Sequence, residues 1–207
     1  MKFIIGTKKH MVQYFSEDGK VYPATLIEAG PITVTGVMTP ERQGYAAIQV
    51  GYGVQKKERM SKPDLGQTKD IGPFRVLKEF RLAENETSEL KTGDTLTAEV
   101  FAKGDTVRVS GVSKSKGFQG VVKRYNFKGG PRTHGQKHSE REPGSIGGGL
   151  RTRVPKGMRM AGRTGGDTVT VRNLQILEVN PETNSLLIKG ALPGRRGSLV
   201  EIVATTN

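Results

Sequence analysis

Alternating apolar and polar positions predict a mainly β protein. Residues 11–30 form two such runs joined at Asp18-Gly19, a dipeptide typical of a hairpin turn. Residues 31–37 and 45–53 are short runs bounded by glycine or proline. Three further runs each start with Gly-Asp-Thr, a turn signal followed by the period-two alternation of a half-buried strand; they begin at Gly93, Gly104 and Gly166.

The C-terminal part of the chain continues this pattern. Residues 174–194 predict a second hairpin, and residues 198–204 predict a last strand. Many short strands at this spacing favour a small closed β-barrel, which is the fold class we predict. Residues 55–82 begin polar and end apolar, so we expect a loop or short helix and then an element that is either strand or helix. We treat residues 55–92 as a small α+β elaboration of the barrel.

The positive charge of the chain lies almost entirely in one block. Residues 114–163 hold thirteen Lys or Arg against Glu140 and Glu142, which is +11 of the formal net charge of +13, and also eleven glycines. The block lies between the second and third Gly-Asp-Thr runs, so it interrupts the β domain. A loop of this length inside a compact domain is improbable unless it is functional. We predict barrel strands in residues 1–113 and 167–207, and a basic arm over residues 114–166.

The residue types in the arm indicate RNA. Cations interleave with Phe118, Tyr125 and Phe127, and this mixture suits phosphate contacts and stacking on unpaired bases. A loop that is only solvated normally mixes both signs of charge. The arm has too few apolar side chains to offset its ordering entropy, so we expect it to be disordered in the free protein and ordered by RNA. The expected RNA-binding residues are Lys114, Lys116, Phe118, Lys123, Arg124, Lys128, Arg132, His134, Lys137, His138, Arg141, Ser145, Gly147, Gly148, Gly149, Arg151, Arg153, Lys156, Arg159 and Arg163.

Other functional classes find little support. The chain has no cysteine, which excludes disulfides and thiolate chemistry, and it has no phosphate-loop or dinucleotide fingerprint. His134 and His138 lack a third metal ligand nearby, and Glu140 and Glu142 are expected to pair with cations of the arm. No apolar run is long enough to span a membrane. We therefore expect an intracellular protein without catalytic residues, metal, cofactor, small-molecule substrate or membrane partner.

Four stretches resemble one known family. Residues 15–37, 117–135, 143–147 and 156–194 are similar to the bacterial form of the universal large-subunit ribosomal protein three. The resemblance covers nearly the whole chain, with residues 55–92 matched loosely. It implies a six-stranded barrel of the translation-protein type at the surface of the large subunit of the cytoplasmic ribosome, and an arm that penetrates ribosomal RNA toward the peptidyl-transferase centre. It also implies a role in early assembly, with ribosomal RNA and neighbouring ribosomal proteins as partners.

The resemblance places the tip of the arm at residues 145–153, where this chain departs from the family. Many bacterial members carry a glutamine that can be methylated directly after Ser-Ile-Gly, but Gly148 stands there in this chain. We therefore expect no methylation at this position. Two alternatives stay open: a transient ribosome-associated or RNA-modifying factor with the same barrel, and a β-barrel whose arm binds a protein.

Overall fold

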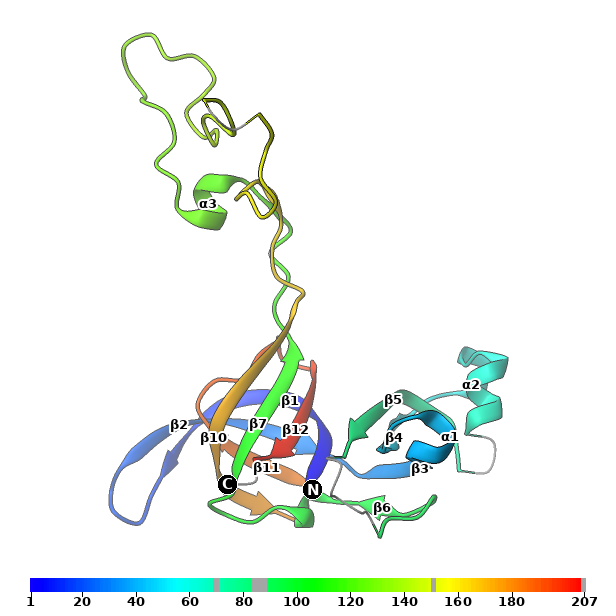
Figure 1. Ribbon diagram of the computed structural model, residues 1–207. Helices are drawn as coiled ribbons and strands as arrows, with labels where there is room; N and C mark the ends of the chain where they lie inside the picture. Colours follow the sequence, from blue (N-terminus) through cyan, green and yellow to red (C-terminus); the bar gives the residue numbers. More distant parts are fainter. Residues whose placement is uncertain (69–70, 83–88, 150–151, 206–207) are drawn as a thin grey trace. The chain divides into compact units, whose positions relative to one another are not determined.

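The computed structural model describes the chain except for residues 69–70, 83–88, 150–151 and 206–207. It divides the chain into two compact units. The barrel unit comprises residues 1–112 and 168–207, and the arm unit comprises residues 113–167. Figure 1 shows strands in the first unit and mostly irregular chain in the second.

The barrel unit contains a closed barrel of six antiparallel strands, as predicted (Figure 1). Around the barrel the strand order is β1-β12-β7-β10-β11-β2, and every neighbouring pair is antiparallel. The barrel strands are β1 (Phe3–Phe15), β2 (Val21–Ala29), β7 (Thr106–Val112), β10 (Thr168–Asn180), β11 (Ser185–Lys189) and β12 (Leu199–Ala204). Its core is made of fully buried aliphatic residues, among them Ile27, Val109, Ile188 and Ile202.

Both predicted hairpins are confirmed. The first turn joins β1 to β2, where Gly19 adopts a positive φ of 74° that glycine permits without steric cost. The second turn joins β10 to β11 through residues 181–184. In both cases a turn signal lies between two runs of alternating residues, so the hairpin forms from neighbouring segments of chain.

A second, four-stranded sheet with the order β5-β4-β3-β6 belongs to the same unit. Its strands are β3 (Ile32–Met38), β4 (Ala47–Val54), β5 (Phe74–Arg81) and β6 (Thr95–Leu96); short helical elements are α1 (Pro40–Gln43), η1 (Lys57–Arg59), α2 (Lys62–Gln67) and η2 (Ala98–Val100). The rings of Phe3 in β1 and Phe80 in β5 stack with centroids 4.4 Å apart. One core cluster therefore contains residues of both the barrel and the second sheet.

One predicted strand is wrong. The Gly-Asp-Thr run from Gly93 forms only the two-residue β6, and the chain then turns into η2. Ala98 is fully buried and Phe101 is 3% exposed, and the Phe101 amide donates to the Ala98 carbonyl at 3.1 Å. A spacing of three residues is one turn of 3₁₀ helix, which points both side chains into the core where a strand would point them to opposite faces.

Candidate nucleic-acid interface

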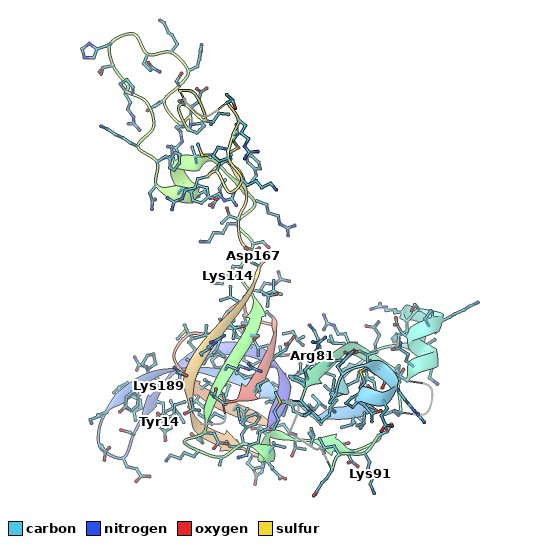
Figure 2. The ribbon with its side chains drawn as sticks, in the orientation of Figure 1. Tyr14, Arg81, Lys91, Lys114, Asp167 and Lys189 are labelled. Atoms are coloured by element: carbon cyan, nitrogen blue, oxygen red, sulfur yellow. The ribbon has the colours of Figure 1, made fainter. Side chains whose placement is uncertain are left out.

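The base of the arm is a paired neck formed by residues 113–119 and 162–167. Its ladder contains β8 (Phe118–Gln119) and β9 (Gly162–Arg163). The Lys116 amide donates to the Thr164 carbonyl, and the Thr164 amide donates to the Gly117 carbonyl, both at 2.9 Å. Figure 2 labels Lys114 and Asp167, one on each segment of the neck. At its base, the two segments of the arm are therefore held together by backbone hydrogen bonds.

Above the neck, the short helix α3 (Val121–Tyr125) forms a clamp with the returning chain. Arg124 Nη1 donates to the carbonyl of Met160 at 2.8 Å. The guanidinium groups of Arg124 and Arg159 lie 5.0 and 5.7 Å from the centroid of the Tyr125 ring, which are cation–π distances. A Cβ on Gly162 would lie only 2.7 Å from Arg124 Nη1, so the guanidinium would have to shift from this position. This clamp is built entirely from residues of the arm.

The sequence did not predict the clamp. Arg124 was expected to contact RNA, and the structure gives its guanidinium two contacts inside the arm. One local signal did exist in the sequence. Asn126 follows α3 with a φ of 59°, and asparagine is among the residues that most readily end a helix in the left-handed conformation.

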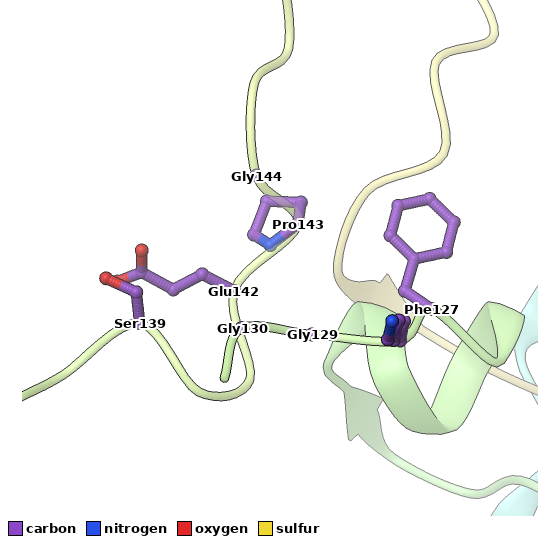
Figure 3. Close-up of a pocket in the computed structure, with 8 residues that line it drawn as sticks. Phe127, Gly129, Gly130, Ser139, Glu142, Pro143 and Gly144 are labelled. Atoms are coloured by element: carbon purple, nitrogen blue, oxygen red, sulfur yellow. The ribbon is translucent and has the colours of Figure 1, made fainter. Parts of the chain in front are cut away.

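Farther along, the chain folds back on itself beside a shallow hollow of about 530 Å³. The Gly130 amide donates to the Glu140 carbonyl at 3.1 Å, and Arg132 forms an ion pair with the Glu140 carboxylate. That ion pair confirms that Glu140 pairs with a cation of the arm. Figure 3 shows the Phe127 ring on one side of the hollow and the Glu142 carboxylate on the other.

The Cβ positions of the tip glycines are open within the described chain. Apart from the chain neighbours, no atom of the described residues lies within 4 Å of the position that a Cβ would take at Gly147, Gly148 or Gly149. Gly148 and Gly149 have φ values of 122° and 63°, which explains glycine at these two positions. Gly147 has no such requirement, so nothing within the described chain explains its lack of a side chain.

The structure describes every expected RNA-binding residue except Arg151, which lies outside the described residues. Arg124 is half-buried, while Phe118 is 78% exposed. His134 has a φ of 60° and is not helical. The remaining described cations of the arm are all exposed: Lys114, Lys116, Lys123, Lys128, Arg132, Lys137, Arg141, Arg153, Lys156, Arg159 and Arg163.

Within the described part of the arm, Arg132 is the one exposed cation with a recorded ion pair. Ten exposed cations thus lack a carboxylate partner among the residues that the structure describes. Such a density of one charge creates a strong positive potential that attracts polyanions. The described residues contain no cluster of three potential metal ligands, and none of their helices is long and apolar enough to cross a membrane.

Comparison with known proteins finds relatives whose matches cover nearly all of this chain and of each relative. The profile of the family Ribosomal protein L3 matches residues 53–187. A protein of Chloroherpeton thalassium named "Large ribosomal subunit protein uL3" is 49% identical, and the match covers 99% of this chain and 100% of the relative. Proteins of the same name from Acidothermus cellulolyticus and Syntrophobacter fumaroxidans are 47% and 46% identical, with 98% and 99% of this chain and 91% and 98% of the relatives covered. By fold, by the arm inserted into the barrel and by this similarity along nearly its whole length, the chain belongs to the ribosomal protein L3 family.

Proposed function

We propose that this protein is a structural, non-enzymatic constituent of the large ribosomal subunit that binds ribosomal RNA directly through its arm. Its relatives carry the name of a large-subunit protein, which supports a place on the cytoplasmic ribosome. The arm extends toward the peptidyl-transferase centre and supports early assembly of the subunit. Its partners are ribosomal RNA and neighbouring ribosomal proteins.

The observation that carries this proposal is the set of ten exposed arm cations without a recorded carboxylate partner. Like charges held close together repel one another unless a polyanion lies between them. Ribosomal RNA supplies phosphates on every side of a penetrating segment. Contacts from Lys and Arg to these phosphates position the protein without reading the base sequence.

The three parts of the arm have different tasks in this mechanism. The neck and the clamp hold the two segments of the arm together. The free energy of RNA binding therefore does not have to offset the entropy cost of ordering this part of the arm. Phe118, exposed at the neck, offers a ring for stacking on an unpaired base or a ribose. At the tip, Ser145 and the glycines 147–149 allow the RNA backbone to approach closely, and Arg153 and Lys156 neutralise phosphates beside them.

The salt dependence of binding tests direct RNA contact. We would measure the Kd of the full chain for large-subunit ribosomal RNA between 50 and 200 mM salt. Each neutralised phosphate contributes a log–log slope of roughly −0.7 to −0.9, so ten contacts give at most about −7 to −9. Binding whose affinity does not change with salt would overturn phosphate contact by the arm and would favour a protein ligand.

A second measurement separates a constituent from a transient factor. Tagged protein is expressed in the source bacterium, and large subunits are purified through a high-salt wash. A constituent remains at one copy per subunit, whereas a transient modifying factor is released or is found only on precursor particles. The first result supports the proposal, and the second overturns it.

A further inference from the structure

The end of the β1–β2 hairpin is a two-stranded ribbon beyond the barrel ladder (Figure 1). β1 pairs with β12 only over residues 3–7, and β2 pairs with β11 only over residues 24–28. Within the described chain, residues 11–15 and 21–23 therefore have ladder partners only in each other. An isolated two-stranded ribbon is marginally stable in water, so the packing on its two faces decides how well it is held.

One face of the ribbon packs on the barrel. In the ladder, Tyr14 lies opposite Tyr22 and Val12 lies opposite Ala24. These four residues belong to a small apolar cluster with Leu26, Leu177 and Leu187. The ammonium group of Lys189 lies 4.2 Å from the centroid of the Tyr22 ring, and Figure 2 labels Tyr14 and Lys189 in this region. This face of the hairpin is thus covered by its own unit.

The opposite face is also apolar, but it is uncovered. Met11, Phe15 and Val21 are 50%, 67% and 49% exposed, and Pro23 is exposed as well. Phe15 pairs with Val21 in the ladder, so their side chains lie on the same face. The solvent face of an antiparallel ribbon is normally polar. A group of exposed apolar residues on it instead marks an interaction surface.

The charge at the turn argues against RNA as the ligand of this surface. Glu17 and Asp18 are exposed, and the structure records no ion pair for either among the described residues. Residues 15–21 carry these two acids and one cation, Lys20, in a chain whose net charge is +13. Phosphates are repelled by such a turn, whereas a lysine or arginine is attracted.

A cavity of about 330 Å³ lies beside the turn, on the covered face of the hairpin. It is lined by Tyr14, Tyr22, Glu17 and Asp18 together with Lys103, and the ammonium group of Lys189 already lies over the Tyr22 ring. The chain's own lysines thus supply the cations of this cavity, and the exposed carboxylates of Glu17 and Asp18 are the groups that attract a cation of a ligand on the uncovered face.

We propose that the hairpin end, residues 11–23, is a docking surface for a neighbouring protein that presents an apolar side chain next to a lysine or arginine. The apolar side chain packs on Met11, Phe15 and Val21, and the cation binds at Glu17 and Asp18. This inference rests on the proposed function, because the neighbour is another protein of the large subunit. A second copy of this chain fits less well, since pairing through this surface brings two acidic turns together.

Photo-crosslinking in assembled subunits tests the proposal. Benzoylphenylalanine replaces Gln13, which is exposed on the same face between Met11 and Phe15, and a second chain carries it at Val54, which is 90% exposed in β4. Large subunits that contain either chain are purified and irradiated, and the crosslinked products are identified by mass spectrometry. We expect residue 13 to crosslink to a peptide of another protein that contains lysine or arginine next to an apolar residue. Residue 54 serves as the exposed control and should not yield that peptide.

Variants of the hairpin then test the chemistry. Phe15→Thr with Val21→Thr keeps β propensity and removes the apolar surface, so the yield of the crosslink should fall roughly tenfold, as for the loss of an interface hot spot. The double variant Glu17→Lys with Asp18→Lys should lower the crosslink yield as well, because it places two lysines opposite the lysine or arginine of the docked protein. Val54→Thr should leave it unchanged.

The failures of the two proposals are distinguishable. If the chain does not purify with large subunits, the proposed function fails, and the docking surface fails with it. If the chain is present but residue 13 crosslinks to RNA, to a second copy of the chain or to nothing, only the docking surface is overturned. A protein crosslink that survives both pairs of hairpin substitutions also overturns it.

Discussion

Arg124 is predicted to stabilise the arm and not to add a phosphate contact. Its guanidinium donates to the Met160 carbonyl at 2.8 Å and lies over the Tyr125 ring. Hydrogen bonds from charged donors contribute about 1.5–3 kcal/mol. Because Arg124 is half-buried, we take the lower end, about 1.5 kcal/mol. Since 1.4 kcal/mol is a factor of ten, Arg124→Gln should increase opening of the clamp and neck about tenfold.

Hydrogen exchange of the neck amides measures this opening. The amides of Lys116 and Thr164 donate across the two segments of the neck and should exchange about tenfold faster in Arg124→Gln. Arg124→Lys keeps the charge but loses the planar group that contacts Met160 and Tyr125 together, so it should also speed exchange. The salt slope of RNA binding should stay unchanged in both variants.

Lys123→Gln provides the matched control on the same helix. Lys123 is exposed, and the structure records no ion pair for it among the described residues. This variant should leave neck exchange unchanged and lower the magnitude of the salt slope by roughly 0.7 to 0.9. If Arg124→Gln instead behaves like Lys123→Gln, with a lower slope and unchanged exchange, then Arg124 contacts phosphate and the reasoning from the clamp is wrong.

Three further predictions concern the tip, the core and one carboxylate. Gly147→Ala should leave the unfolding free energy unchanged by calorimetry, because no atom of the described residues crowds its Cβ position. The same variant should weaken RNA binding in a titration, and equal binding would refute close RNA packing there. Ile202→Ala removes a fully buried side chain and should cost about 2–5 kcal/mol in urea unfolding, whereas Val169→Thr, at a 41% exposed site, should change little. The Ala102 amide and the Lys2 ammonium group lower the pKa of Asp105, so its stabilising contribution is present above its unfolded pKa of about 3.9 and is lost as pH falls through the lower folded pKa. In acid unfolding, the difference in unfolding free energy between wild type and Asp105→Asn should therefore become smaller below that pH. A difference that stays constant with pH would contradict this role.

Local patterns in the sequence were sufficient for the hairpins and for most barrel strands. Turn residues and period-two alternation act between neighbouring residues, so Asp18-Gly19 and the runs from Gly104 and Gly166 predicted their elements correctly. The composition of residues 114–163 was likewise readable without a structure, because charge and glycine content do not depend on how the chain folds.

Elements that depend on distant partners were not predicted. The type of residues 74–82 stayed open in the sequence; their identity as β5 follows from pairing with β4, where the Phe74 ring packs so closely on Gly51 that a Cβ there would collide. The run from Gly93 was expected to be a strand because its alternation is local, but burial of Ala98 and Phe101 in the core favours a 3₁₀ turn. In each case the deciding contact comes from a segment far away in the chain.

The amino-acid sequence by itself thus determined the strand-rich fold class, the basic character of the arm and the expectation of a polyanionic partner, because these follow from local pattern and charge. The tertiary structure decided which strands close the barrel and which tip glycine lacks an explanation within the described chain. It also decided that Arg124 contacts Met160 and that an apolar face of the first hairpin is left uncovered. The physical reason is that backbone pairing and side-chain burial are fixed by residues far apart in sequence, whose positions no local pattern specifies.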